Sequence, residues 1–125
     1  MTDPNTLLEK GLKAFNAGEY YDAHEHWEEL WSEHQLPDRV FIQGLIQMAV
    51  GCFHLTNDNL TGARNLFTKA LPKLETGLPN QRNLNVHELI DCVREAGELV
   101  QHIEKCADFD WDLVPEIRQV QRNEA

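Results

Sequence analysis

The residues best suited to chemistry cluster in "YDAHEHWEELW", residues 21–31, which holds two histidines, four carboxylates and two tryptophans. His24 and Glu28 stand one helical turn apart, so both side chains could reach the same ion. Imidazole and carboxylate groups together bind a divalent transition metal ion, here zinc, iron, nickel or manganese. Adding His54 from a later segment gives two histidines and one carboxylate, with positions left open for water. We therefore predict a metal site formed by His24, Glu28 and His54.

A bound ion of this kind would lower the pKa of its water and supply a hydroxide nucleophile near neutral pH. Under this interpretation the protein is a metal-dependent hydrolase, with Glu25 as general base and Glu28 as both catalytic residue and ligand. The spacing, however, matches no established metal motif. It reads HExHxxE rather than the HExxH of zinc proteases, and Tyr21 stands where di-iron bundles carry the glutamate of an ExxH pair.

These side chains are predicted to lie on an amphipathic helix over residues 19–33. At 100° per residue its apolar stripe faces the core, and the opposite face is predicted to be exposed to solvent. His24 and Glu28 fall at the edge of the stripe, with Glu25 and Tyr21 slightly further round. The stripe consists of Tyr20, Ala23, Trp27, Leu30 and Trp31, and the solvent face of Asp22, His26, Glu29 and Glu33.

The next helix along the chain, predicted over residues 38–56, is apolar almost all the way round. This is typical of a helix at the centre of a bundle. Its polar exceptions, Gln43, Gln47 and His54, share one narrow sector. Each would need a partner, because burying an unpaired polar group costs roughly 1–3 kcal/mol. The nearest partners are the polar residues at the edge of the preceding helix. We therefore predict a small buried polar pocket between the two helices that binds substrate through Tyr21, Trp27, Trp31, Gln43 and Gln47.

The same residues allow two other interpretations. The polar groups could close a structural hydrogen-bond network that fixes the register of the two helices and needs no ligand. Alternatively, the protein is a non-enzymatic scaffold or interaction module that binds a peptide in a groove between helical hairpins. The expected partner is therefore an unknown small molecule or a peptide.

Five helices and no strand are predicted along the chain. The other three helices are expected over residues 6–17, from 58 or 59 to about 74, and over 85–105. Pro72 should kink the fourth helix or end it early, while Asp38 and Asn85 are the expected N-caps of the third and fifth. The segment "CADFDWDLVPEI", residues 106–117, is too apolar for a free tail and is expected to lie back over the bundle.

An internal repeat points to the architecture. "FNAGEYYDAHEHWEELW" overlays "LTNDNLTGARNLFTKAL" at a spacing of forty residues, which places Ala23 on Ala63 and Trp27 on Phe67. Each copy predicts a helix, a short turn and an amphipathic helix, as in tetratricopeptide-like hairpins, and two copies are too few for a stable solenoid. We therefore expect an all-α fold: a compact five-helix bundle of antiparallel helical hairpins, distantly tetratricopeptide-like, with an ordered C-terminal segment, in one domain over residues 1–125.

The composition limits the partners. Eleven lysines and arginines against 21 acidic residues give a formal net charge of −10, which repels nucleic acid and anionic membranes. No apolar run is long enough to span a membrane, and the first residues lack the features of a signal peptide. Three cysteines without CxxC spacing suit a reducing compartment. We expect a cytoplasmic monomer or small homo-oligomer that binds neither nucleic acid nor membrane.

The segments "FNAGEYYDAHEHWEELW", "FIQGLIQMAVGCFHL" and "NLTGARNLFTKAL" resemble a prokaryotic family catalogued as domain of unknown function 309. The resemblance extends from Leu8 to Leu74. Members are small all-helical bundles, sometimes labelled predicted metal-dependent hydrolases, so the resemblance implies that fold and, through the label, a metal site. In this sequence the family's motif positions are Gly18, Glu19, His24, Glu25, Glu28, Trp31, Gln43, Gly44, Gln47 and His54.

Overall fold

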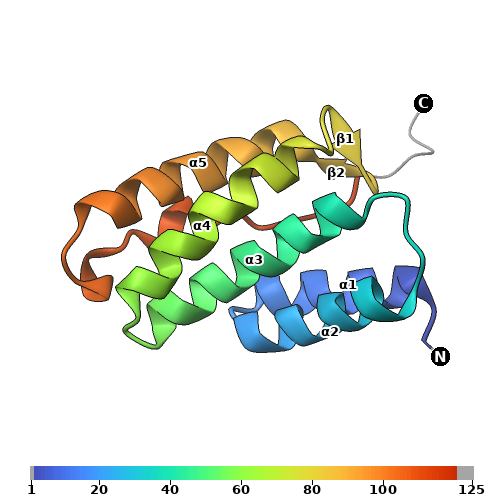
Figure 1. The fold of residues 1–125 in the computed structure, drawn as a ribbon, viewed down its shortest axis with the longest axis horizontal. Helices are drawn as coiled ribbons and strands as arrows, with labels where there is room; N and C mark the ends of the chain where they lie inside the picture. Colours follow the sequence, from blue (N-terminus) through green and yellow to red (C-terminus); the bar gives the residue numbers. More distant parts are fainter. Residues whose placement is uncertain (1, 121–125) are drawn as a thin grey trace.

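Five α-helices dominate the protein in a computed structural model, which describes residues 2–120 (Figure 1). The predicted all-α fold is confirmed, and each expected helix is found with its ends shifted by a few residues. Within residues 2–120 no helix is long and apolar enough to cross a membrane. The helices are α1 (Pro4–Asn16), α2 (Tyr20–Glu33), α3 (Arg39–Thr56), α4 (Leu60–Glu75) and α5 (Val86–His102).

The helices pair as two hairpins, α1–α2 and α3–α4, which correspond to the two copies of the sequence repeat. Equivalent side chains are buried alike, since Trp27 and Phe67 are 0% and 2% exposed. The turns match as well: Gly18 (φ 80°) and Asp58 (φ 58°) stand forty residues apart and both adopt the left-handed conformation. The repeat in the sequence is therefore a repeat of backbone geometry.

Pro72 does not end α4, which continues to Glu75. A proline removes the amide that would donate to the carbonyl four residues earlier, here that of Thr68. Thr68 lies on the exposed side of the helix, where water can replace the missing donor. Of the two predicted effects of Pro72, a kink or an early end, the early end is therefore wrong.

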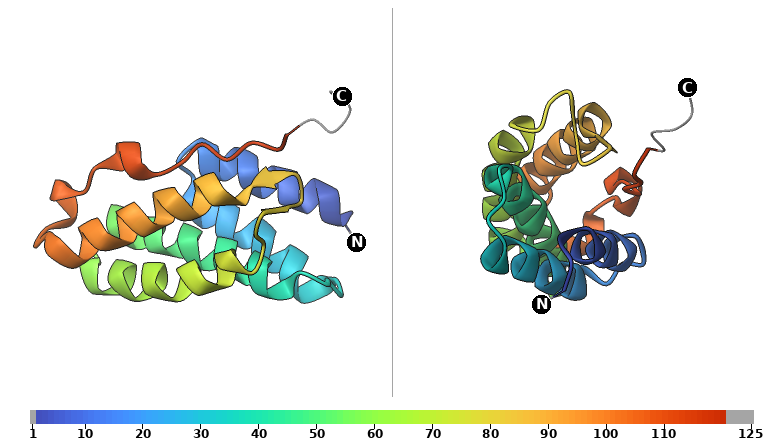
Figure 2. Two further views of the ribbon diagram at one scale, coloured as in Figure 1. Left: turned by 90° about the horizontal axis from the view of Figure 1, so that it is seen from above. Right: turned by 90° about the vertical axis from the view of Figure 1, so that its right-hand side faces the viewer.

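The helices follow one another around an open arc, each packed on the next (Figure 2, right). The chain after α5 lies across the open side of that arc, between α5 and α1 (Figure 2). It forms two short 3-10 helices, η1 (Cys106–Asp108) and η2 (Trp111–Leu113), and then runs on without helix to Val120. Its Phe109 and Ile117 belong to the core, which confirms the expected ordered C-terminal segment. We call residues 106–120 the strap.

A small hairpin joins α4 to α5, so the prediction of no strand is wrong. β1 (Asn80–Gln81) pairs antiparallel with β2 (Leu84–Asn85). Arg82 and Asn83 between them have φ of 54° and 61°, the left-handed pair that a tight hairpin turn requires. Strands of two residues are too short to show an alternating pattern in the sequence.

The hairpin is tied to the start of α3 by Asp38. Nε and Nη2 of Arg82 each donate to its carboxylate at 2.8 Å, and Nε2 of Gln81 donates at 3.2 Å. Asp38 occupies the N-cap position of α3 but its side chain makes no capping hydrogen bond, because the carboxylate faces the hairpin instead. Asn85, by contrast, caps α5 as predicted, accepting from the Glu88 amide at 3.1 Å.

Candidate functional site on the α2–α3 face

The contact between α2 and α3 places most of the predicted site residues at the surface of the bundle rather than in its core. Tyr21 at the start of α2 packs on Phe53 near the end of α3, with ring centroids 5.2 Å apart, so the two helices run antiparallel. On the other side of α3, Gly44 and Gly51 pack closely against α4. The polar sector of α3 lies between these two packed edges and therefore points toward solvent.

The prediction of a buried polar pocket is therefore wrong. Within residues 2–120 no polar or charged residue belongs to the fully buried core. Of the predicted site residues, Tyr21, Glu25 and Glu28 are exposed, and the half-buried ones are His24, Trp31, Gln43, Gln47 and His54. We call the surface formed by Tyr21, His24, Glu25, Glu28, Gln43 and Gln47 the α2–α3 face.

Trp27 does not contribute to this face. Its side chain is fully buried and turned toward α1, where Nε1 donates to the carbonyl of Leu8 at 3.2 Å. The ring lies flat on Gly11, and a methyl group added there would stand 2.0 Å from Trp27 Nε1. Trp27 thus seals the first hairpin, and the prediction that it walls a substrate pocket is wrong.

Trp31 fixes the junction between α2 and α3. Its Nε1 donates to the carbonyl of Arg39 at 3.2 Å, and Nη1 of Arg39 donates back to the carbonyl of Trp31 at 2.8 Å. The Arg39 guanidinium also lies 4.0 Å from the centroid of the Trp31 ring, a cation–π distance. Arg39 and Phe53 are contributors that the sequence pattern did not single out, since both look like ordinary residues of α3.

Two of the three predicted metal ligands lie close together. His24 Nε2 is 4.0 Å from Glu28 Oε2. His54 instead lies beside the α3–α4 turn, with Nδ1 3.3 Å from Nδ2 of Asn59 and its ring against Gly62. Within residues 2–120 no group of three or more histidine, cysteine or carboxylate side chains is placed to hold a metal ion.

One polar atom of α2 and one of α3 are enclosed without a partner. Nδ1 of His24 and Oε1 of Gln47 are shielded from solvent, and neither finds a hydrogen-bond partner in residues 2–120. Glu28 Oε2 lies 4.0 Å from Nε2 of His24, outside hydrogen-bonding distance. In the neutral tautomer that is protonated at Nε2, Nδ1 is an acceptor. Both open atoms are then acceptors.

The carboxylates of α2 add to this excess of acceptors. The helix carries five of them and no lysine or arginine. In the part of the chain that the structure describes, none of the five pairs with a lysine or arginine side chain. Of the predicted solvent face, Asp22 and Glu33 are exposed, whereas His26 and Glu29 are half-buried.

Comparison with known proteins gives one family. Residues 8–66 match the model described as "Domain of unknown function (DUF309)". This region of the chain is similar to the DUF309 family. No curated protein sequence matches the chain. The DUF309 region runs from α1 into the first half of α4 and so contains the whole α2–α3 face, while the hairpin, α5 and the strap lie outside it.

Proposed function

We propose that the protein is a non-enzymatic binding module whose α2–α3 face recognises a cationic segment of a partner polypeptide. The observation that carries this proposal is the excess of hydrogen-bond acceptors over donors on that face. Buried polar groups in folded proteins are normally paired, yet His24 Nδ1 and Gln47 Oε1 are both open. A ligand that brings N–H donors would supply what the protein itself lacks there.

Ammonium and guanidinium groups are the donors that fit this surface. They carry several N–H groups and no acceptor, and their hydrogen bonds to carboxylates are stronger than neutral ones. Glu25 and Glu28 follow His24 on α2 and are exposed, so a cation can approach them without moving the backbone. The net charge of −10 would steer such a partner toward the protein.

Tyr21 offers the same partner an aromatic surface. Its side chain is 48% exposed, and its ring lies 5.4 Å from that of His24. A lysine or arginine seated between Glu28 and Tyr21 would make an ion pair and a cation–π contact together. Its approach needs only a rotation of these exposed side chains to reach the acceptors beneath.

The test is binding of a fluorescein-labelled Arg-Gly repeat peptide, followed by fluorescence anisotropy. Replacing both acids of the face, Glu25→Gln with Glu28→Gln, should raise the Kd at least about tenfold, since each charge-assisted contact is lost. The matched control is Glu95→Gln with Glu98→Gln, which removes the same charge at the same spacing from the exposed side of α5. Equal effects of the two double variants would show non-specific attraction and overturn the proposal.

A divalent metal ion is the second candidate ligand, favoured by the approach of His24 and Glu28. The donor set fits it only in part. A catalytic zinc site normally has three protein ligands, and a ligating histidine normally donates its other N–H to an acceptor, whereas Nδ1 of His24 is open. Metal-dependent hydrolysis with Glu25 as base would therefore rest on two protein ligands and water.

Calorimetric titration of tag-free protein with zinc distinguishes this candidate. A site on the α2–α3 face predicts one ion for each chain, lost in His24→Ala and kept in His54→Ala, because His54 is turned toward α4. Unchanged zinc binding by His24→Ala would rule out the face as the metal site. Hydrolase activity becomes a candidate function only if one zinc ion binds to each chain and this binding is lost in His24→Ala.

We place the protein in the cytoplasm. All three cysteines are free, which suits a reducing compartment. Burial raises the pKa of the Cys52 thiol, so this cysteine behaves as a small apolar side chain rather than as a reactive one.

A further inference from the structure

The strap is bound as a peptide would be. Nδ2 of Asn16 donates to the carbonyl of Ile117 and the Ile117 amide donates to Oδ1 of Asn16, both at 2.8 Å. Further on, the Val120 amide donates to the carbonyl of Asn83 at 2.6 Å, and an antiparallel bridge joins Gln119 to Leu84. The strap thereby adds an extended segment to the hairpin, which is a recurring mode of peptide recognition.

These polar contacts recognise backbone rather than sequence. The Asn16 amide pairs with the backbone amide and carbonyl of one residue, which every amino acid except proline presents. Side-chain selection in this part of the strap falls to Ile117, which is 6% exposed. The groove therefore accepts any extended segment that places an apolar side chain at this register.

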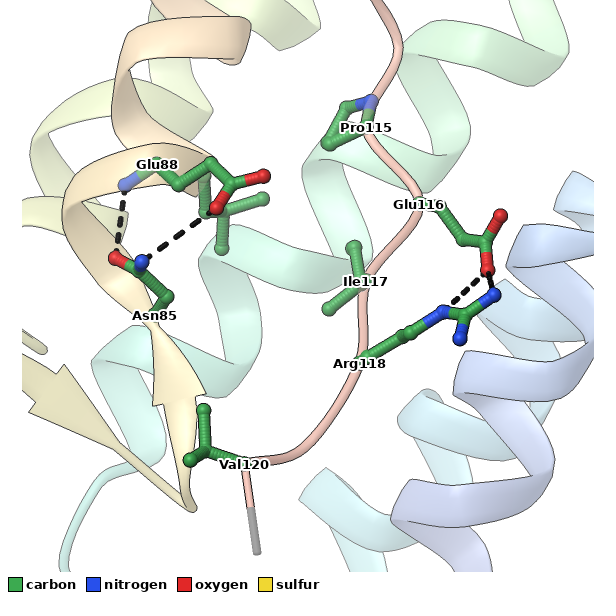
Figure 3. A pocket seen from close by; sticks show the side chains of 8 residues that line it. Asn85, Glu88, Pro115, Glu116, Ile117, Arg118 and Val120 are labelled. Carbon is green, nitrogen blue, oxygen red and sulfur yellow. Dashed lines mark hydrogen bonds and ion pairs between the residues drawn. The ribbon is translucent and has the colours of Figure 1, made fainter.

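The strap does not fill the groove. A cavity of about 260 Å³ separates residues 115–120 from the first turns of α5 (Figure 3). Its apolar lining comes from Leu89 of α5 and from the strap residues Pro115, Ile117 and Val120. The polar residues that line it are Asn85, Glu88, Glu116 and Arg118. A cavity of about 150 Å³ already holds a benzene ring, so this space has room for an aromatic side chain that the strap does not supply.

We propose that the groove between α1 and α5 is a docking site for an extended segment of a partner protein that carries an aromatic side chain at the register of Ile117. Residues 115–120 of the strap occupy this groove when the partner is absent. The site lies on the open side of the helical arc, away from α3 (Figure 2). It is therefore separate from the α2–α3 face and independent of the function proposed for it.

A partner must compete with a tethered strap. The tether gives the strap an effective concentration on the order of millimolar, so a free peptide of identical sequence binds weakly. A peptide with an aromatic side chain at this position repeats the backbone contacts of the strap and also fills the cavity. It should therefore bind at least about tenfold more tightly than the native sequence.

The test uses the full chain and two fluorescein-labelled peptides of residues 112–120, one native and one carrying Ile117→Trp. Anisotropy should give a Kd at least about tenfold lower for the peptide with Ile117→Trp. In the full chain, Ile117→Asp removes the strap's own anchor and should tighten binding of both peptides at least about tenfold. The control Ala107→Asp adds an acid at an exposed position of the strap that does not line the cavity and should leave both affinities unchanged.

Hydrogen exchange of the unaltered chain provides a readout that does not depend on a variant. Saturating Ile117→Trp peptide should speed amide exchange at residues 115–120 and leave α3 protected. Absence of binding, equal affinity of the two peptides, or unchanged exchange at residues 115–120 would each overturn the proposal. Tightening by the control Ala107→Asp equal to that by Ile117→Asp would overturn it as well.

Discussion

At the scale of single residues, the open oxygen of Gln47 is the most informative atom of the α2–α3 face. A buried acceptor without a donor costs about 1–3 kcal/mol of stability. A structural network would have closed this bond, because satisfied networks are what rigidify a core. An unpaired acceptor on α3 and an unpaired histidine nitrogen on α2 are instead what a surface that binds a ligand would show.

Gln47→Met tests this interpretation. Methionine has a similar length and no polar atom to leave unpaired, so we expect the free energy of unfolding to rise by up to about 1 kcal/mol. Gln43→Met is the matched control, since Gln43 shares the polar sector of α3 but has no enclosed, unpaired atom. Urea denaturation followed by circular dichroism measures both. A loss of about 1–3 kcal/mol in Gln47→Met alone would support the structural network.

The sequence predicts which residues share this face but not how deep they lie. Periodicity gives the direction of a side chain around its own helix, and it correctly groups Gln43 with Gln47 and His24 with Glu28. It does not say which neighbouring helix stands in that direction. Trp27 and Trp31 share one stripe, yet the first meets α1 and the second meets the start of α3.

At the scale of elements, the Asp38–Arg82 pair holds the hairpin against α3 and makes its attachment depend on pH. The Asp38 side chain is 7% exposed. Burial by itself would raise the pKa of this carboxyl, but the hydrogen bonds and charge of Arg82 outweigh it and hold the pKa below its ordinary value. The carboxylate therefore contributes fully above about pH 4, and its contribution is lost as pH falls through the lowered pKa.

Asp38→Asn should accordingly lower the free energy of unfolding by about 2 kcal/mol near neutral pH, because Arg82 keeps its charge but loses its bidentate partner. The difference from the unaltered protein should shrink as pH falls through the lowered pKa of Asp38, where the native carboxyl also becomes neutral. Urea denaturation across this range measures it. A difference that stays constant with pH would mean that the shape of the side chain, not its charge, holds the hairpin.

The equivalent turns of the two helical hairpins give a matched pair of substitutions. A left-handed residue other than glycine is strained by roughly 1 kcal/mol, although aspartate tolerates the conformation better than most. Gly18→Ala should therefore lower the free energy of unfolding by about 1 kcal/mol. Asp58→Gly, forty residues later, should leave it unchanged or raise it by up to about 0.5 kcal/mol. Thermal unfolding compares them, and shifts in the same direction would contradict the equivalence of the two turns.

Elements were predictable from the sequence in proportion to their length. Each helix has thirteen or more residues and repeats its apolar pattern over several turns. The helix is therefore predicted by more turns of this pattern than the prediction needs. The hairpin offers only two residues to each strand, and its turn residues, Arg82 and Asn83, are not the usual Asn-Gly pair. Its anchor, Asp38, lies more than forty residues away and resembles an ordinary helix cap.

At the scale of the whole molecule, the strap covers the side of the helical arc that the two helical hairpins leave open. Stacked helical hairpins bury their faces only against neighbours, and the arc of α1 to α5 leaves one side open. Tyr20 stacks on Trp111 of η2 at a centroid distance of 5.7 Å, and burial, with a smaller effect of nearby Cys52, raises the pKa of Tyr20 to about 12. The apolar content of residues 106–117 predicts that the strap is ordered. It does not predict that the strap covers the open side of the helical arc.

The acidic surface sets the last prediction. Five carboxylates on one helix repel one another and so lower the free energy of unfolding. Proteins retain such destabilising groups where they serve a function such as binding. Glu25→Lys places a cation among them and should raise the free energy of unfolding by about 0.5 kcal/mol at low ionic strength. The gain should vanish in about 1 M salt, where screening is nearly complete.

Binding should change in the opposite direction, because the same Glu25→Lys substitution repels a cationic peptide from the α2–α3 face. Glu98→Lys is the control, since it makes the same change of charge on α5, where Arg94 already stands one turn away. It should neither stabilise the protein as much nor weaken the binding of the Arg-Gly peptide as strongly. Urea denaturation and anisotropy on the same samples measure both quantities. A stabilised Glu25→Lys protein with unchanged binding would show that the acidic face of α2 is not the surface the partner uses.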